Sequence, residues 1–382
     1  MTEWKQYKLG DVIKTNAKSI GKNYPYSKIL YLDTGSITCN SIDSYQEFEI
    51  DKAPSRAKRL VNQDDIIYSL VRPNQLHHGY ITNPPDNLVV STGFVTITSN
   101  PQYLCPKFLY YYLTQPYITE FLHSVAEAST SAYPSLKPSD IEVLDIELPS
   151  LPTQRRIASI LTSLDDKIDL LRRENATLEQ MAETLFRQWF VVEAKEEWEE
   201  GKLGDEFAFT MGQSPNGDSF NEEGIGIPMY QGNADFGFRF PTRRVYTTQP
   251  TRFAEVNDTL ISVRAPVGAQ NMAIEKCCIG RGVAAFRYKN NPSYYSYTYY
   301  KLKSLLEEIK QFNDNGTVFG SISKSDFENL DIVIPDENTI MSFQQQVKPI
   351  DDKIINNNNE IRTLIQTRDG LLPRLMSGEI KV

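Results

Sequence analysis

The sequence is poor in the residues that build catalytic, metal and disulfide sites. It has four cysteines, none in Cys-x-x-Cys spacing, and only three histidines in 382 residues. We therefore expect no structural metal site and no disulfide framework. No run approaches the about 18 apolar residues that cross a bilayer, and no basic segment followed by an apolar one opens the chain. A cytoplasmic protein is expected.

Positive charge is also scarce, because Asp and Glu outnumber Lys and Arg and the net charge is -9. This balance argues against a protein that wraps DNA through bulk positive charge. Many of the acidic side chains lie in residues 193–207 and 217–224. Screening by salt limits the electrostatic effect of their charge to about 8–10 Å. Any surface for nucleic acid must therefore be local.

Complete catalytic motifs are missing as well. Asn83-Pro84-Pro85-Asp86 departs at its fourth residue from the N-P-P-aromatic loop of adenine methyltransferases, and a proline-rich turn explains it. Glu200-Gly201-Lys202 has the E-x-K spacing of a nuclease but no suitably placed upstream Pro-Asp. Neither a glycine-rich cofactor loop nor the phosphate-binding loop of ATPases is present. We expect a chain that has no catalytic site and binds no cofactor.

What the sequence does contain is an internal repeat, at an offset of about half its length. The matching segments are residues 4–11 with 198–205, 65–70 with 258–263, 139–149 with 325–335, and 164–169 with 350–355. A chain of this length, with 40% hydrophobic residues, can bury two cores. Each half is therefore expected to be one structural unit.

Each half has the pattern of a globular part followed by a long helix. Short β-branched and aromatic runs, broken by Gly, Pro, Asn and Asp, fill the first part of each half. The predicted fold class is α+β, with two globular domains separated by two long antiparallel coiled-coil helices in a pseudo-two-fold repeat. The predicted bounds are 1–150 and 193–336 for the domains, and 151–192 and 337–376 for the helices.

The coiled coil is predicted from apolar residues at alternating steps of three and four. The expected spacer-helix seam includes Leu161, Leu164, Ile168, Leu171, Asn175, Leu178, Val347, Ile350, Ile354, Asn357, Ile361 and Leu364. Asn175 would set the register of the two helices at some cost in stability, and Thr153 is the expected N-cap of the first helix. About 35 residues would give a spacer of about 50 Å. The alternative to a coiled coil is that the apolar stripe of each helix packs only on its own domain.

Together these features resemble the specificity subunit of type I restriction-modification systems over essentially the whole chain. The resemblance rests on the two-fold domain–helix order, on residues 148–161 (LPSLPTQRRIASIL) with 164–169 (LDDKID), on 350–354 (IDDKI), and on 371–380 (LLPRLMSGEI). One departure is Ile340, where the family often repeats the glutamine found at Gln154.

The resemblance implies a function and a set of partners. Each domain would be a target-recognition domain that reads one half of a bipartite target in double-stranded DNA. The helices would set the gap and dock modification (methyltransferase) subunits, two per chain, and the restriction (endonuclease/translocase) subunit would join the complex. Trp189 and Phe190 are candidate docking residues, and burial against the second domain is the alternative.

Candidate DNA contacts are side chains in loops next to strand-like runs, because polar and basic groups there can bind phosphates and base edges. They are Arg72, Asn74, Gln75, His77, His78, Ser129, Thr130, Ser131, Tyr133 and Lys137 in the first half, and Gln213, Ser214, Arg264, Gln270, Asn315, Thr317 and Lys324 in the second. Arg72 and Arg264 stand out because both follow the repeated strand. A solvated loop is the alternative for each.

Three further alternatives concern stacking and function. The tyrosine-rich runs 108–112 and 294–300 could stack on bases, but their helical spacing favours buried helices. A fused restriction–methylation enzyme would need the missing motifs. A structural adaptor would join two protein-binding domains without reading DNA, and the acidic composition is its best support.

Overall fold

The computed structural model describes residues 4–129, 133–264, 266–313 and 320–382. The chain divides into two compact units. Unit 1 consists of residues 1–170 and 361–382, and unit 2 of residues 171–360. In the described part of the chain, no helix is both long enough and apolar enough to cross a membrane.

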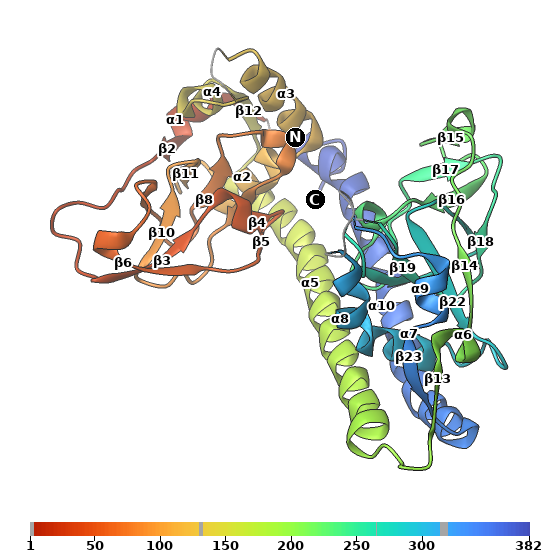
Figure 1. The fold of residues 1–382 in the computed structure, drawn as a ribbon. Coiled ribbons are helices and arrows are strands. Elements are labelled where there is room, and N and C mark those ends of the chain that lie inside the picture. The colour runs from red at the N-terminus through yellow and green to blue at the C-terminus, as the bar shows by residue number, and fades with distance from the viewer. Residues whose placement is uncertain (1–3, 130–132, 265, 314–319) are drawn as a thin grey trace. The chain divides into compact units, whose positions relative to one another are not determined.

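Unit 1 is built on small sheets, most of whose strands are labelled in Figure 1. The four-stranded sheets have the orders β6-β3-β10-β7 and β2-β11-β8-β9, and two-stranded sheets join β1 to β12 and β4 to β5. The strands are β1 (Lys5–Lys8), β2 (Ile13–Thr15), β3 (Lys28–Leu32), β4 (Ile37–Thr38), β5 (Ser41–Ile42), β6 (Gln46–Glu49), β7 (Ala57–Leu60), β8 (Ile66–Ser69), β9 (His78–Tyr80), β10 (Leu88–Ser91), β11 (Phe94–Ser99) and β12 (Asp145–Leu148). The helices are α1 (Leu9–Val12), α2 (Pro106–Leu113), α3 (Pro116–Glu127), α4 (Pro138–Glu142) and the 3-10 turns η1 (Thr34–Ser36), η2 (Ile50–Lys52) and η3 (Pro73–Gln75).

Unit 2 repeats three of these sheets, one of them with an added strand, and its described residues form no counterpart of the β4–β5 sheet. Its sheets have the orders β13-β23, β14-β22-β19-β20 and β15-β17-β16-β21-β18. The strands are β13 (Glu199–Lys202), β14 (Phe207–Met211), β15 (Phe220–Asn221), β16 (Ile227–Tyr230), β17 (Val245–Thr247), β18 (Phe253–Ala254), β19 (Thr259–Ser262), β20 (Gln270–Met272), β21 (Cys277–Ile279), β22 (Val283–Tyr288) and β23 (Asp331–Ile334). The helices are α6 (Leu203–Glu206), α7 (Tyr295–Ser304), α8 (Leu306–Lys310), α9 (Lys324–Glu328) and the 3-10 turns η5 (Gly217–Ser219), η6 (Asn233–Asp235) and η7 (Gln311–Asn313).

The topology confirms the internal repeat. The β13–β23 pair matches β1–β12, and the sheet β14-β22-β19-β20 matches β2-β11-β8-β9 strand for strand. Even the parallel pair recurs, as β3 with β10 in unit 1 and β16 with β21 in unit 2. Strand β15 has no counterpart, and it is therefore the addition in unit 2.

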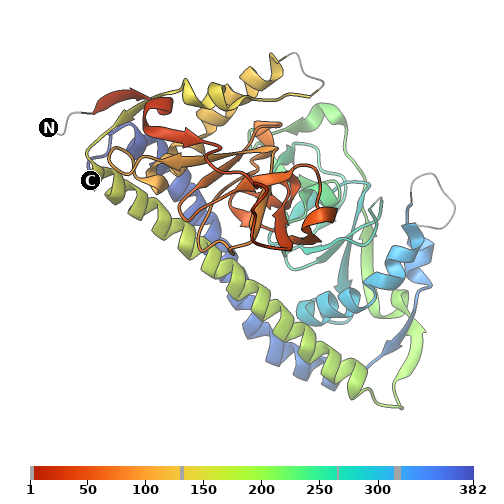
Figure 2. The same ribbon diagram turned by 90° about the vertical axis from the view of Figure 1, so that its left-hand side faces the viewer.

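Two long helices supply residues to both units. They are α5 (Leu151–Arg187), which ends in a π-helical turn (Gln188–Val192), and α10 (Glu337–Met376). Figure 2 shows them side by side. The first helix begins at Leu151, two residues before the predicted cap. The hydroxyl of Ser150 accepts the N–H of Thr153 at 3.4 Å, so Ser150 rather than Thr153 caps the helix.

Contacts inside each unit show that the helices are antiparallel. In unit 1, Arg368 of α10 donates to Asp165 of α5 at 2.9 Å. In unit 2, the amide of Asn357 donates to the Asn175 oxygen at 2.9 Å. From the first contact to the second, the residue number increases in α5, from 165 to 175, and decreases in α10, from 368 to 357. Asn175 and Asn357 are 4% and 1% exposed, so their hydrogen bond lies inside the helix pair.

The predicted seam residues lie in the interior to different degrees. Leu161, Ile168, Leu171, Asn175, Val347, Ile354, Asn357 and Ile361 are buried, and Leu164, Leu178, Ile350 and Leu364 are half-buried. The helices also enter the cores of the units, with Leu161 and Leu375 in that of unit 1 and Phe186 and Val347 in that of unit 2. Each helix therefore faces both its partner helix and a globular part.

The tyrosine-rich runs form the core helices α2 and α7, which confirms the prediction that they are buried. Tyr111 of α2 donates to the Asp165 carboxylate at 2.7 Å, and Tyr112 donates to the carbonyl of Asp145 at 2.7 Å. Phe190 is 9% exposed and packs on Tyr297 and Phe343 in the core of unit 2. Phe190 is therefore buried rather than available for docking.

Two buried glutamines cap the starts of these core helices. In unit 1, the side-chain oxygen of Gln154 accepts the N–H of Cys105, directly before α2, at 2.8 Å. In unit 2, Ile340 occupies the equivalent position and is buried. Gln344, one turn further along α10, accepts the N–H of Ser296 at 3.0 Å instead. The departure at Ile340 is thus compensated within the same helix.

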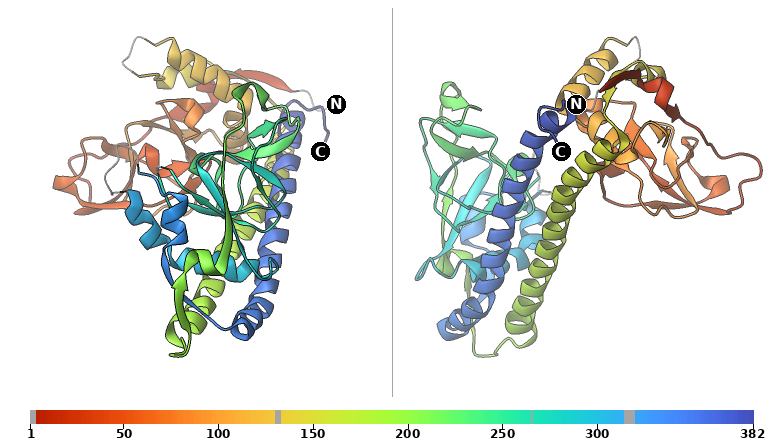
Figure 3. Two further views of the ribbon diagram at one scale, coloured as in Figure 1. Left: turned by 45° about the vertical axis from the view of Figure 1, so that its right-hand side comes forward. Right: turned by 180° about the vertical axis from the view of Figure 1, so that it is seen from behind.

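Both ends of the described chain lie in unit 1 and close together (Figure 3). Gly378 follows α10 with a φ of +74°, and a Cβ there would lie 3.0 Å from the Trp4 ring. A larger residue would be strained in this conformation and would also crowd the indole. The glycine of the closing LMSGEI segment therefore has a packing role.

We predict that Asn175 and Asn357 are energetically coupled. Asn357→Leu alone should lower the free energy of unfolding by about 1–3 kcal/mol, because the buried Asn175 amide loses its partner. The double variant Asn175→Leu/Asn357→Leu should recover most of this loss, since leucine suits a seam position. Urea unfolding of the four proteins of this cycle measures the coupling. Additive losses would contradict the prediction.

Candidate nucleic-acid interface

In the first unit, two of the predicted DNA-contacting loops lie together. Arg72 follows β8 with a φ of +47°, a left-handed conformation in which the chain turns sharply into η3. Its N–H donates to the carbonyl of Pro134 at 3.1 Å, and its guanidinium carbon lies 5.7 Å from the Tyr133 ring centroid. The loop after β8 is therefore held against the loop before α4, and Arg72 meets an exposed aromatic ring.

The second unit holds the corresponding loops in the same way. Arg264 forms an antiparallel bridge with Ser321, as Val71 does with Ser135 in unit 1. Arg264 therefore occupies the position of Val71, and Arg72 stands one residue further along. Both arginines belong to the same loop of the repeat, but they are not equivalent residues.

A short turn that joins strands of two different sheets packs against each of these loops, between β10 and β11 in unit 1 and between β21 and β22 in unit 2. The N–H of Leu70 donates to the carbonyl of Gly93 at 2.8 Å, and the N–H of Val263 donates to that of Gly282 at 2.9 Å. In unit 2 this turn, residues 280–282, also contacts the loop after β14. The N–H of Arg281 donates to the Ser214 hydroxyl at 3.2 Å. Ser214 and Arg264, far apart in sequence, thus flank one turn.

Glycines make this close approach of backbones possible. A Cβ at Gly212 would lie 2.1 Å from the carbonyl oxygen of Gly280, and one at Gly282 would lie 2.1 Å from that of Gln231. Such distances are impossible, so only glycine permits the three chain segments to touch. We call residues 212–214, 263–264, 280–282 and 320–324 the second loop cluster, and residues 70–77, 91–93 and 133–137 the first loop cluster.

The second loop cluster gathers arginines that have no carboxylate partner among the described residues. Arg239, Arg243, Arg244 and Arg287 are each paired with a carboxylate elsewhere in unit 2. Arg264 and Arg281 are exposed and have no such partner, and neither has the exposed Arg252, whose carbonyl accepts the N–H of Ile279 at 2.9 Å. The sequence analysis missed Arg252 and Arg281. A Gly-Arg-Gly turn after an apolar strand is the signal that could have found Arg281.

Other predicted residues have ordinary structural partners. Gln270 donates to the carbonyl of Tyr299 at 2.7 Å, and the N–H of the His77 ring points to the carbonyl of Ile37 at 2.6 Å. Lys324 forms an ion pair with Glu328 on the same helix. Asn74, Gln75, Gln213 and Lys137 are exposed and Ser129 is half-buried. Thr130, Ser131, Asn315 and Thr317 lie outside the described residues.

His78 is part of the core rather than of the loop surface. It is 5% exposed, stacks on Tyr68 with 5.9 Å between ring centroids, and places Nδ1 3.3 Å from the Tyr110 hydroxyl. Burial, with a smaller contribution from His77, lowers the pKa of His78 to about 4. We therefore leave His78 out of the proposed interface.

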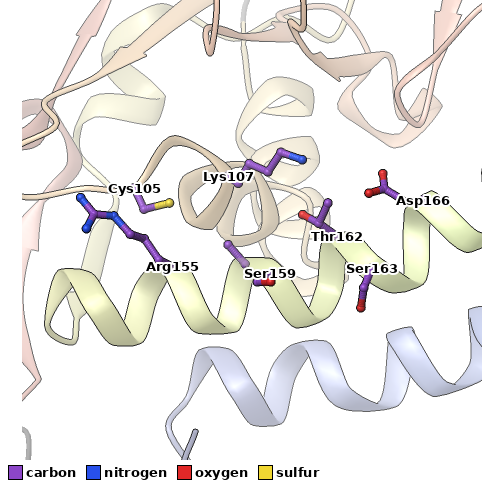
Figure 4. A pocket seen from close by; sticks show the side chains of 8 residues that line it. Cys105, Lys107, Arg155, Ser159, Thr162, Ser163 and Asp166 are labelled. Carbon is purple, nitrogen blue, oxygen red and sulfur yellow. The ribbon is translucent and has the colours of Figure 1, made fainter.

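No other site is evident in the ranges that the structure describes. No three His, Cys, Asp or Glu side chains there lie close enough to hold a metal ion. A shallow groove of about 390 Å³ runs along the start of α5, between Arg155 and Asp166 on that helix and Lys107 on α2 (Figure 4). Its charges are mixed and it lies apart from the residues of the first loop cluster.

The fold of repeated α+β units and two long helices is that of type I restriction-modification S subunits. The crystal structure of the S subunit from M. genitalium is 18% identical, with a TM-score of 0.61, over 98% of this chain and 96% of that one. The chain belongs to the type I restriction modification DNA specificity domain family, whose model matches residues 1–180 and 195–367. It is therefore a non-catalytic DNA-recognition subunit, as the sequence predicts.

Two relatives are similar over nearly their whole lengths. The type I restriction enzyme HindI specificity subunit of Haemophilus influenzae is 26% identical over 468 aligned positions, which cover 100% of both chains. The putative type I restriction enzyme MjaX specificity subunit of Methanocaldococcus jannaschii is 27% identical over 408 positions, which cover 100% of this chain and 94% of that one.

We predict that His78 makes unit 1 sensitive to acid. Below pH 6.5 the unfolded chain protonates this ring, whereas the folded chain keeps it neutral until about pH 4. Stability should therefore fall as the pH falls between these values, by about 3 kcal/mol in total. His78→Phe should lose part of this pH dependence, and His123→Phe, on the surface helix α3, should retain it. Urea unfolding at pH 7 and at pH 4.5 measures this loss of stability. If His78→Phe lost as much stability between the two pH values as the unchanged protein, the prediction would be contradicted.

Proposed function

We propose that the chain reads a bipartite sequence in double-stranded DNA. Residues 1–150 would be a target-recognition domain that reads one half-site with the first loop cluster. Residues 193–336 would be a second such domain that reads the other half-site with the second loop cluster. The observation that carries this proposal is the recurrence of one loop arrangement in both units, with arginine beside the short turn that joins two sheets.

The chemistry of the two loop clusters suits DNA in a chain of net charge -9. Arginine binds phosphates and pairs with the guanine edge, and glutamine pairs with adenine. The second loop cluster offers Arg264, Arg281 and Gln213 as exposed donors, and Arg252 lies next to it. The first offers Arg72, Asn74, Gln75 and Lys137. Both loop clusters thus present exposed basic and amide donors although the chain as a whole is acidic.

We also propose how the chain assembles. The helices at 151–192 and 337–376 would set the gap between the half-sites and dock modification subunits in the cytoplasm. Two similar halves offer two similar docking surfaces, so two modification subunits per chain are expected, joined by a restriction subunit. Each modification subunit would lie near the adenine that it extrudes. The mass of the reconstituted complex measures this ratio.

Exchange of residues 1–150 for the corresponding part of another specificity subunit tests whether each domain reads its own half-site. The half-site read by the first loop cluster should change completely, while the other half-site and the gap stay the same. Mapping of methylated adenines in a strain that carries the chimaera is the measurement. Changes in both half-sites would contradict the assignment of one half-site to each unit.

The arginines of the second loop cluster should contribute to DNA binding, whereas arginines that are paired with carboxylates should not. Arg281→Ala should weaken binding by the assembled complex by ~1–3 kcal/mol at one base pair if it makes a base contact, or lower the salt slope by about 1 if it binds phosphate. Arg243→Ala is the matched control, because Arg243 is paired with Glu275. Titrations at several salt concentrations distinguish the two contacts. If Arg281→Ala kept the affinity and the salt dependence of the unchanged complex, the assignment of DNA contact to the second loop cluster would be contradicted.

A further inference from the structure

We propose that Asp165 and Asp351 are positioning residues, which hold each globular part at a defined angle on the helix pair and thereby set the gap between the half-sites. The two residues are 186 positions apart and occupy the same place in the repeated segments LDDKID and IDDKII. The claim about the gap rests on the proposed function. The claim about the angle does not, because it concerns contacts within each unit.

Asp165 connects three elements of unit 1. One carboxylate oxygen accepts the hydroxyl of Tyr111 on the core helix α2 at 2.7 Å. The other accepts the guanidinium of Arg368 on α10 at 2.9 Å. Asp165 itself lies on α5, so a single carboxylate bonds the sheet-bearing part of the unit and the opposite long helix at once. Hydrogen bonds to a charged group are strong and directional, which suits a fixed angle.

Asp351 does the same in unit 2 from the other helix. One of its oxygens accepts the Arg239 guanidinium at 2.8 Å and the hydroxyl of Tyr300 on the core helix α7 at 3.3 Å. Arg239 belongs to the loop between β16 and β17, and it also donates to Glu179 of α5 at 3.0 Å. This network therefore joins the globular part of unit 2 to both long helices as well.

The two networks use different partners for the same purpose. Arg368 comes from the opposite helix in unit 1, whereas Arg239 comes from the globular part in unit 2. Only the aspartate and a tyrosine from the tyrosine-rich helix are common to both. This shared pair explains why the first aspartate of the segment recurs although its surroundings differ.

The adjacent residue Asp166 provides a matched control. It has the same side chain and lies on the same helix, but it is exposed on the wall of the groove beside Lys107 and bonds to neither α2 nor α10. Asp165→Ala removes both hydrogen bonds of the network, whereas Asp166→Ala removes none of them. Alanine favours helix at both positions, so the helix itself is preserved.

The angle is measured without DNA by spin-label distances within unit 1. One label is placed on the globular part at Lys52→Cys and one on α10 at Gln366→Cys, both at exposed positions. Cys39 and Cys105, which are not fully buried, are first replaced by serine, and the buried Cys277 and Cys278 stay. Asp165→Ala should broaden the distance distribution, and Asp166→Ala should leave it unchanged. An equally narrow distribution in both would overturn the claim about the angle.

The gap is measured with the assembled methyltransferase complex, on DNA in which the two half-sites are kept and the gap is changed by one base pair either way. The preference of Asp165→Ala for the correct gap should drop about tenfold, the factor that one hydrogen bond to a charged group can supply. Methylation of wrong half-sites should not rise. A general loss of stability would instead lower methylation equally at every gap.

The remaining outcomes separate the proposals. A wild-type complex without a preferred gap would overturn the bipartite function and the gap claim together, and the label distances would still decide the claim about the angle. Unchanged gap preference in a variant with a broadened distribution would overturn the gap claim alone. Should Asp165→Ala not fold, Tyr111→Phe removes one donor at nearly constant volume. The same changes, smaller in size, are then expected.

Discussion

The burial of Arg239 between two helical carboxylates is the interaction on which unit 2 depends. Its side chain is 1% exposed, and the partners Glu179 and Asp351 are 7% and 1% exposed. A charge in such a place is tolerable only when it is paired and fully hydrogen-bonded, and its guanidinium also stacks 3.3 Å from the Tyr299 ring centroid. The β16–β17 loop, α5, α7 and α10 must therefore all be in place together, which makes folding of the globular part and pairing of the helices one event.

The family comparison and the loop clusters address different questions. Membership of the DNA specificity family establishes what kind of subunit the chain is, whereas the loop clusters are our proposal for where in each unit DNA would be read. A chain that carries more acid than base can still bind DNA if its unpaired arginines gather in one place. Arg252, Arg264 and Arg281 do so around one turn, residues 280–282.

The large-scale fold could be predicted because it rests on patterns that are local or repeated. Heptad spacing predicts the two long helices, self-similarity predicts the two units, and helical spacing predicts that the tyrosine runs are buried. Contacts between distant segments could not be predicted in this way. His78 looks like a loop residue in sequence, yet it begins strand β9 and its side chain is buried in the core. Arg264 resembles Arg72 by spacing, but the bridge with Ser321 places it where unit 1 has Val71.

Glycines in and beside the turn at residues 280–282 limit which positions of the second loop cluster can change. Any side chain at Gly212 or Gly282 would collide with backbone, whereas Gln213 and Arg281, which alternate with them, face outward. On the proposed function, substitutions that change the target would fall at positions such as Gln213 and Arg281 and not at the glycines beside them. Such substitutions would alter contacts to DNA without disturbing the backbone contacts that hold the loops together.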